Sequence, residues 1–222
     1  MLKKIRVWDL PTRVFHWLFA IVIIGALITI NLDETELHAK FGYAAFVLVT
    51  FRIIWGFVGP QHARFSSFVP SIGKLKAFIK HPVSDHLGHN PLGAISVIAI
   101  LLIILLQTTT GLFTDDEIIF QGPLSHLVSS SVVSFLTGVH AFNSNLIYAL
   151  VGLHLAAIFY YQKVKKENLI KPMLTGDKEV SQEEANTPTD LIPSKDHWRV
   201  RGLAILILIV IGAGFYFLVI KK

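Results

Sequence analysis

The sequence predicts an all-α integral membrane protein: a four-helix transmembrane bundle followed by a fifth, C-terminal transmembrane helix, with the N-terminus in the cytoplasm. Only 16% of the 222 residues are charged, whereas an ordinary soluble domain has about a quarter. Five long apolar stretches cover residues 14–30, 41–58, 92–106, 146–161 and 203–220. With their uncharged flanks, each reaches the roughly 17–25 residues that cross a bilayer. This composition excludes a soluble enzyme, a nucleic-acid-binding domain and a disordered tail.

The residues that flank these stretches predict where the helices begin and end. Asp9 can cap the first helix, with Pro11 in its first turn, where proline is tolerated. Pro60 follows the second stretch, and Pro91 begins the third. Because residues 121–138 mix apolar and small polar side chains, we expect a short helix there that lies at the membrane interface.

The chain divides into three expected parts. Residues 1–175 form the four-helix transmembrane domain, residues 176–200 a polar cytoplasmic linker and residues 201–222 the fifth transmembrane helix. No small-x-small cleavage site follows the first apolar stretch, so we interpret that stretch as a retained span and not as a secretory signal.

Positive charge near the ends of the spans indicates which side faces the cytoplasm. Lysines and arginines gather in the segments 3–13, 64–80 and 163–199, which the predicted topology places on one side. The opposite connections, 31–37 and 113–139, contain no lysine or arginine. They carry acidic residues instead: Asp33, Glu34, Glu36, Asp115, Asp116 and Glu117. The N-terminus is therefore expected inside, with acidic loops outside.

The chain contains ten histidines and no cysteine. The lack of cysteine excludes disulfides, iron–sulfur clusters and a c-type haem, whose attachment needs a C-x-x-C-H box. Four of the histidines lie at or inside the ends of spans, where an ionisable side chain is costly and usually has a specific partner. They are His16, His38, His140 and His154.

Spacing and topology place these four histidines at two depths. His140 and His154 are 14 residues apart, which is about 21 Å along a helix and within roughly 40° of the same face. The predicted topology puts His38 at the depth of His140, and His16 at the depth of His154. Two imidazoles that face each other across a helix bundle suit the two axial positions of a haem iron. The sequence thus predicts two haem b groups, with an interfacial role for each histidine as the alternative.

Three further residues fit this interpretation. Arg52 lies 14 residues after His38, on the same helix face, where a haem propionate can act as its counter-ion. The alternative is an arginine that snorkels to the cytoplasmic surface. Gly42 and Gly152 leave room for a flat macrocycle near the helix backbone, or are ordinary helix-packing positions.

Several motifs resemble those of the bacterial di-haem cytochrome b family, which includes bacterial cytochrome b561 and the cytochrome b subunit of nickel–iron hydrogenases. They are RVWDLPTRVFHW at 6–17, LHAKFGY around His38, FRIIWGFVGP around Arg52, GPLSHLVSS around His126, GVHAFNSNLIYALVGLHLAAI around His140 and His154, and ENLIKPMLTGDK at 167–178. The resemblance covers most of residues 5–178 and leaves the fifth span outside it. It implies axial ligands in the pairs His16/His154 and His38/His140, which agrees with the pairing from spacing.

The resemblance also implies a function: a cytochrome of the bacterial inner membrane that carries electrons across the bilayer between the quinone pool and a periplasmic redox partner, either a hydrogenase or a c-type cytochrome. Such a protein is an electron-transfer subunit more than a stand-alone enzyme, with quinone as its diffusible substrate. Separately from the resemblance, the expected helix at 121–138 and the fifth span are candidate contact surfaces for a homo-oligomer. The first alternative is a self-contained quinone-coupled oxidoreductase of a small periplasmic donor such as superoxide. The second is a histidine-lined metal or proton transporter.

Overall fold

The computed structural model describes residues 2–81, 87–116, 120–181 and 192–221. The chain divides into two compact units, and each is described by itself. The sheet unit comprises Met1–Val14, Ile54–Ala99 and Gly152–Ala204. The cavity unit comprises Phe15–Ile53, Ile100–Val151 and Ile205–Lys222.

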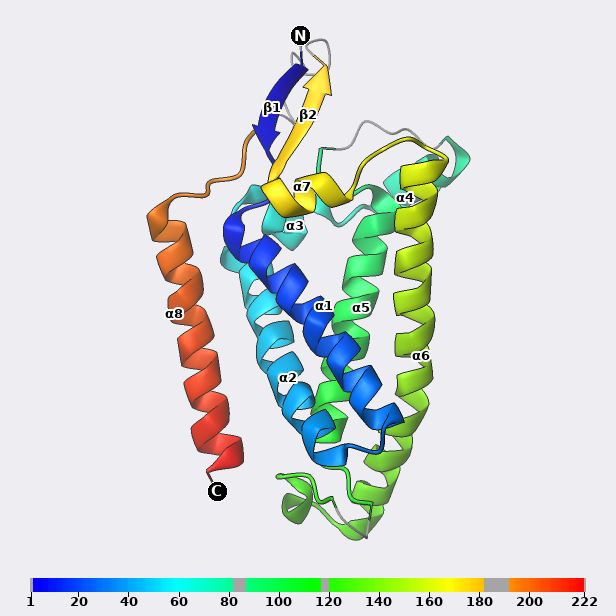
Figure 1. The fold of residues 1–222 in the computed structure, drawn as a ribbon, viewed down its shortest axis with the longest axis vertical. Coiled ribbons are helices and arrows are strands. Elements are labelled where there is room, and N and C mark those ends of the chain that lie inside the picture. Colours follow the sequence, from blue (N-terminus) through cyan, green and yellow to red (C-terminus); the bar gives the residue numbers. More distant parts are fainter. Residues whose placement is uncertain (1, 82–86, 117–119, 182–191, 222) are drawn as a thin grey trace. The chain divides into compact units, whose positions relative to one another are not determined.

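Within the described residues, five helices are long and apolar enough to span a membrane, as predicted (Figure 1). They are α1 (Leu10–Asn31), α2 (Thr35–Val58), α5 (Pro91–Gly111), α6 (Ser130–Lys163) and α8 (Trp198–Phe215), the last extended by a π-helical turn over Tyr216–Ile220. The protein is therefore a multi-pass membrane protein.

Helix α6 is much longer than its apolar stretch. It begins at Ser130 and runs for 34 residues, because the uncharged residues before His140 continue the helix without a break. The separate interface helix expected over residues 121–138 is absent as such from the described part of this region. Residues Ser125–Leu127 form a single 3-10 turn, and the rest of the expected helix belongs to α6.

The sheet unit contains a two-stranded antiparallel sheet that the sequence did not predict (Figure 1). Strand β1 (Leu2–Arg6) pairs with β2 (Asp177–Ser181), so that Arg6 lies opposite Asp177. Strand β2 lies within the segment 176–200 that was expected to be a polar linker. Residues 182–191 of that segment lie outside the described residues.

The short helix α7 (Ile170–Thr175) connects α6 to this sheet. It ends at Gly176, whose φ of 89° lies in the left-handed region that favours glycine. The carbonyl of Gly176 accepts hydrogen bonds from the backbone N–H groups of Val7 (2.8 Å) and Trp8 (3.0 Å). The end of α7 is thereby joined to the segment that leads into α1.

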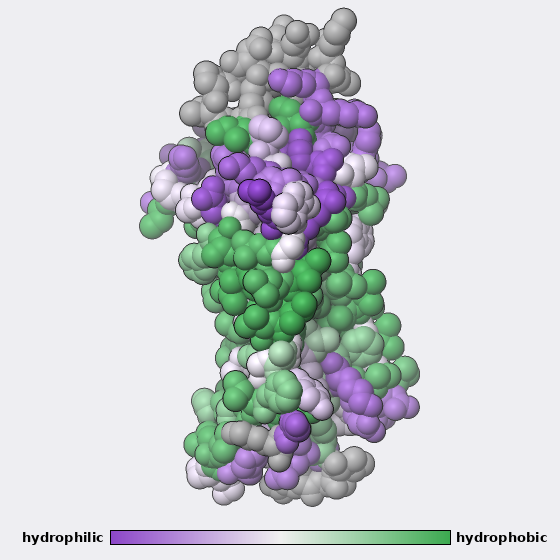
Figure 2. All heavy atoms as spheres, turned by 90° about the vertical axis from the view of Figure 1, so that its left-hand side faces the viewer, coloured by the Kyte–Doolittle hydropathy of each residue, from purple (hydrophilic) through white to green (hydrophobic). Residues whose placement is uncertain are grey.

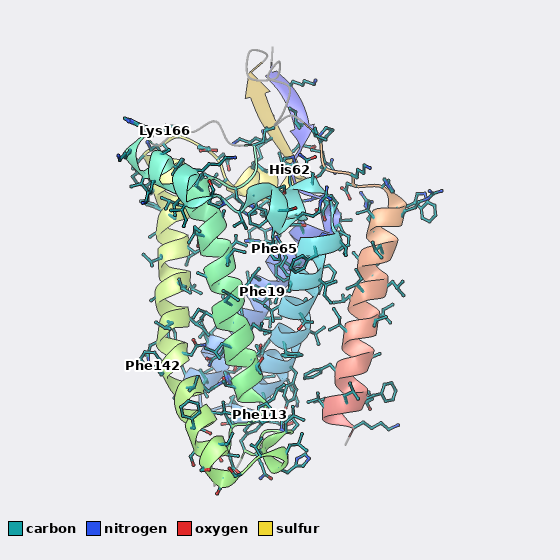
Figure 3. The ribbon with its side chains drawn as sticks, turned by 180° about the vertical axis from the view of Figure 1, so that it is seen from behind. Phe19, His62, Phe65, Phe113, Phe142 and Lys166 are labelled. Carbon is teal, nitrogen blue, oxygen red and sulfur yellow. The ribbon has the colours of Figure 1, made fainter. Side chains whose placement is uncertain are left out.

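Short helical segments follow α2 in the sheet unit: η1 (Gln61–Ala63), α3 (Phe65–Phe68) and α4 (Ile72–Lys80). The Phe65 ring lies against Gly56 of α2, where a Cβ would collide with it (Figure 3). Helix α4 buries Phe78 but leaves Ile72 and Ile79 exposed. An amphipathic helix of this kind, beside a membrane-spanning helix, suits the membrane interface.

The spans keep a large part of their apolar surface on the outside, as expected of helices that face lipid. Phe142 of α6 is 69% exposed and points away from its neighbours (Figure 3). Helix α8 presents a largely hydrophobic face (Figure 2). In the cavity unit, Phe215 of α8 packs its ring against Tyr43 and Phe46 of α2, with centroid distances of 5.7 and 5.2 Å.

Candidate functional site

The cavity unit brings two of the predicted histidines close together. His38 lies in the first turns of α2 and His140 in α6, and their ring centroids are 6.3 Å apart with the ring planes at 85°. Two metal–nitrogen bonds of about 2 Å each, plus roughly 1 Å from each nitrogen to its ring centre, would separate two axial imidazoles by roughly 6 Å. The pair therefore has the spacing that a shared iron requires.

The backbone fixes the tautomer of both rings. Nδ1–H of His38 donates to the carbonyl of Ala26 (2.9 Å), and Nδ1–H of His140 donates to the carbonyl of Gln107 (3.0 Å). A carbonyl oxygen can only accept, so the proton of each neutral ring sits on Nδ1 and the lone pair on Nε2. Metal-ligating histidines are usually oriented in this way, by a hydrogen bond from the ring nitrogen that does not bind the metal.

Polar groups of α5 and α6 surround His140. The side-chain NH₂ of Gln107 donates to Nε2 of His140 (3.1 Å). The side-chain oxygen Oε1 of Gln107 accepts from the side-chain amide of Asn143 (2.8 Å). The hydroxyl of Thr110 lies 3.2 Å from Nδ1. On α5, a Cβ at Gly111 would lie 2.9 Å from the His140 ring. The absence of a side chain at Gly111 is thus what allows the ring to occupy its position.

The two histidines line a cavity of ≈ 540 Å³ within the cavity unit, inside the 300–1,000 Å³ range of small-molecule and cofactor sites. Its walls are largely apolar, from residues such as Ile23, Leu27, Ile104, Leu112 and Ile147. Gly42 also lines it, and a Cβ there would meet nothing within 4 Å. Paired imidazoles in an apolar cavity of this size fit a haem b.

One end of the cavity is polar and acidic. Thr114, Asp115, Asp116 and Thr137 contribute to its lining there. These residues belong to a connection that the charge pattern places outside, and Glu117 of the same acidic run lies outside the described residues. The cavity therefore ends among negative groups on the expected outer side.

The structure places the remaining predicted residues on the expected helices. His16 lies on α1 in the cavity unit, and His154 on α6 in the sheet unit. Because they belong to different units, their pairing stays a prediction. Arg52 lies on α2 and is 3% exposed, so a guanidinium is buried at membrane depth. Gly152 is exposed on α6, which suits a lipid-facing position as well as a site beside a macrocycle.

A second set of buried polar groups lies in the sheet unit, at the start of α1. Asp9 is fully buried and caps the helix, as predicted: its carboxylate accepts from the backbone N–H (2.9 Å) and the hydroxyl (2.8 Å) of Thr12. It also accepts from the indole of Trp55 (3.2 Å). Burial raises the pKa of Asp9 above its usual value, against the opposing effect of these hydrogen bonds.

Asp196 joins the segment before α8 to the same end of α1. It accepts from Arg6 (2.7 Å), from Arg201 (3.0 Å) and from the backbone N–H of Leu10 (3.2 Å). Burial acts to raise the pKa of Asp196, but the hydrogen bonds from Arg201, Leu10 and Arg6 outweigh it and hold that pKa below the usual value. Nearby, Ser194 donates from its backbone to Arg6 and from its hydroxyl to Val7.

Sequence reasoning missed Gln107, Thr110 and Asn143. The signal for the first two is a polar run, QTTTG, at the end of an otherwise apolar span. The signal for Asn143 is its position three residues after His140, which places it on nearly the same helix face. Neither signal identifies its partner, because the contacts join α5 to α6 across more than thirty residues of chain.

Membrane-spanning helices around an apolar cavity, with two imidazoles close together in its wall, are the features of a membrane-bound b-type cytochrome. The comparison with known families agrees. The family model described as prokaryotic cytochrome b561 matches residues 7–176. The chain belongs to this family, and it is an electron-transport protein of the membrane that uses haem b.

One curated relative is similar along most of its length. It is the "Probable Ni/Fe-hydrogenase B-type cytochrome subunit" of Bradyrhizobium diazoefficiens, 24% identical over 212 residues, which cover 79% of this chain and 86% of the relative. No solved structure matches. The family match ends at residue 176, so β2, Asp196 and α8 lie beyond it.

Proposed function

We propose that this cytochrome carries electrons across the bacterial inner membrane between the quinone pool and a periplasmic redox protein, through two haem b groups at different depths. His38 and His140 would hold the outer haem, and His16 and His154 the inner one. The observation that carries the proposal is the His38–His140 pair, 6.3 Å apart across an apolar cavity.

The residues around the outer pair have definable tasks. The backbone carbonyls of Ala26 and Gln107 hold both rings with the lone pair on Nε2. At His140 the Gln107 side-chain amide donates to that lone pair, so a bound metal would replace this hydrogen bond. Two histidine ligands leave no open position on iron, which favours electron transfer over oxygen binding or activation. The haem itself would supply a one-electron redox couple. The apolar walls would exclude water and so influence its potential.

The proposal that His16 and His154 form the inner pair is supported by the sequence and by one buried charged residue, Arg52. His16 and His154 match in depth by the predicted topology, and both helices that carry them are membrane-spanning. Arg52 is almost completely buried on α2. Arg52 would be one of the residues that hold a haem propionate, since a guanidinium complements a carboxylate in charge and in hydrogen bonding.

The periplasmic partner would bind near the acidic end of the cavity. Asp115 and Asp116 line that end, so a partner with a basic surface is favoured, and a hydrogenase or a c-type cytochrome is the expected kind. The name of the curated relative, a hydrogenase cytochrome subunit, agrees with the first. Negative charge at this position disfavours an anionic donor such as superoxide.

The test is a dithionite-reduced minus oxidised spectrum of the purified protein, with haem counted per chain. We expect two b-type haems in the wild type and one in each of His38→Ala and His16→Ala. His126→Ala, at an exposed position outside the spans, is the control and should keep both. A wild-type protein with one haem, or a His16→Ala variant with two, would refute the di-haem proposal.

A further inference from the structure

Helix α4 of the sheet unit lies close to the end of a membrane-spanning helix. It follows α2, which ends at Val58, and precedes α5, which begins at Pro91. The connecting segment folds back on α2, because the Phe65 ring packs on Phe57 with a centroid distance of 5.4 Å and lies against Gly56. Figure 3 shows α4 lying across the end of α5 and not parallel to it. The helix is therefore placed where a span meets the headgroups of the bilayer.

One side of α4 is packed, and another carries exposed isoleucines. Phe78 is 7% exposed, whereas Ile72 is 75% and Ile79 is 60% exposed. At about 100° per residue, the two isoleucines lie within about 20° of each other and roughly 120° from Phe78. The packing of Phe78 therefore leaves an apolar edge, formed by Ile72 and Ile79, on the outside of the protein.

Two lysines flank this isoleucine edge. Counted in the same way, Lys76 and Lys80 lie about 40° and about 80° from Ile72, whereas Lys74 lies about 160° from it. All three lysines are exposed, and no ion pair between described residues includes any of them. Residues 59–84 contain no aspartate or glutamate. The edge thus combines apolar side chains with positive charge that no carboxylate of this stretch neutralises.

This pattern matches the surface of a bilayer in both its apolar and its charged part. Lysines beside an apolar face extend their aliphatic stems along it and place their ammonium groups in the headgroup layer. The charge pattern places this loop on the cytoplasmic side, because Arg64 and the three lysines of α4 gather in it. An apolar edge that enters the acyl region, with ammonium groups at its border, finds partners for both in an anionic phospholipid.

We infer that α4 is a lipid-binding helix, with Ile72 and Ile79 inserted at the acyl boundary and Lys76 and Lys80 bound to the phosphate groups of anionic phospholipids. This inference goes beyond the proposed function and does not depend on haem or on quinone. It assigns a ligand to the basic loop between α2 and α5. It also makes the attachment of this loop sensitive to the lipid composition of the membrane.

The experiment uses the full-length holoprotein in nanodiscs, with haem counted per chain. Amide hydrogen exchange over residues 72–80 is compared between discs of phosphatidylcholine alone and discs that also contain phosphatidylglycerol. The test variant is Lys76→Gln with Lys80→Gln. The matched control is Lys74→Gln with Lys3→Gln, which removes the same charge from the opposite face of α4 and from β1.

In the wild type and in the control, we expect exchange about tenfold slower in the discs that contain phosphatidylglycerol. Each lysine at an anionic surface contributes about a fivefold preference, and neighbouring lysines do not add fully. The test variant should exchange equally fast in both kinds of disc. High salt should reduce the difference in the wild type, because it screens the attraction between ammonium and phosphate groups.

Three outcomes would overturn the inference. Exchange that is equally slow in both kinds of disc, and in the test variant, would mean that protein and not lipid covers α4. Exchange that is equally fast in both kinds of disc would mean that the wild-type helix does not bind the anionic lipid. A control that loses the difference together with the test variant would show an effect of net charge and no site at the isoleucine edge.

A second variant tests the apolar part of the site separately. Ile72→Ser with Ile79→Ser keeps both lysines and removes the side chains that would enter the acyl region. We expect faster exchange over residues 72–80 in both kinds of disc. Wild-type exchange in this variant would refute the insertion of the edge.

Discussion

The interactions that stabilise the sheet unit differ in kind from those that stabilise the cavity unit. The sheet unit relies on backbone pairing between β1 and β2, on a fully buried carboxylate at Asp9 and on the contacts of Asp196 with arginines. The cavity unit has apolar helix surfaces around an open cavity, with polar groups concentrated at His38 and His140. The first unit should therefore respond to charge and pH, and the second to its cofactor.

The largest effect is expected in the cavity unit, from a substitution at Gly111. A side chain there would lie 2.9 Å from the His140 ring, so Gly111→Val should displace the imidazole and remove the outer haem. We expect the b-haem content to fall by about half, measured by the reduced minus oxidised spectrum. Gly138→Ala is the control, because a Cβ at Gly138 meets nothing within 4 Å. A Gly111→Val protein with full haem content would show that His140 is not confined by α5.

The next effect concerns the buried carboxylate of the sheet unit. Asp9→Leu removes the acceptor for Thr12 and Trp55, and we expect a loss of about 2–4 kcal/mol in the free energy of unfolding. Asp9→Asn keeps one acceptor oxygen without the charge and should cost much less. Thermal unfolding in detergent measures both. Equal losses in the two variants would mean that the charge, and not the hydrogen bonds, matters at this position.

The pH dependence of Asp9 has a definite sign. Burial raises its folded-state pKa above the usual aspartate value. Its contribution to stability is thus fully present below the unfolded pKa and is lost as the pH rises through the folded pKa. Asp9→Asn should remove this part of the pH profile.

A smaller effect is expected at Asp196, which joins α8 to the start of α1. Asp196→Asn weakens the contacts with Arg6 and Arg201, and we expect a loss of about 1–2 kcal/mol, limited because both arginines are partly exposed to solvent. The folded-state pKa of Asp196 is held low, so its stabilisation is present above the unfolded pKa and lost as the pH falls through the folded one. Hydrogen exchange over residues 192–197 measures the opening. Unchanged exchange in Asp196→Asn would contradict this role.

The smallest effect is expected at an exposed ion pair of the cavity unit. Lys40 and Glu36 are 2.7 Å apart on the surface of α2, and pairs of this kind contribute little because solvent screens them. Glu36→Gln should leave both the unfolding temperature and the haem content unchanged within error. A clear loss of stability in this variant would show that surface charge matters to the cavity unit as well.

The sequence was sufficient to predict the five spans and the helices that carry the four histidines, because long apolar stretches and isolated ionisable residues are local signals. It could not reveal the β1–β2 sheet, since Leu2–Arg6 is too short and too basic to read as a strand without its partner some 170 residues away. The Gln107–Asn143 contact could not be predicted either, because neither residue carries a local signal that identifies its partner on the other helix. Apolar content does not mark the start of α6, because the helix continues through uncharged polar residues from Ser130 onward.

Gly176 has a further consequence. The family match begins at residue 7 and ends at residue 176, and the Gly176 carbonyl is hydrogen bonded to the N–H groups of Val7 and Trp8. The two ends of the shared module therefore meet at one point. Chain ends that lie this close are what permit circular permutation and the addition of new segments. A permuted chain that begins elsewhere, with residues 7 and 176 joined by a short linker, should therefore still form the module, and β2 and α8 lie beyond it in the sequence.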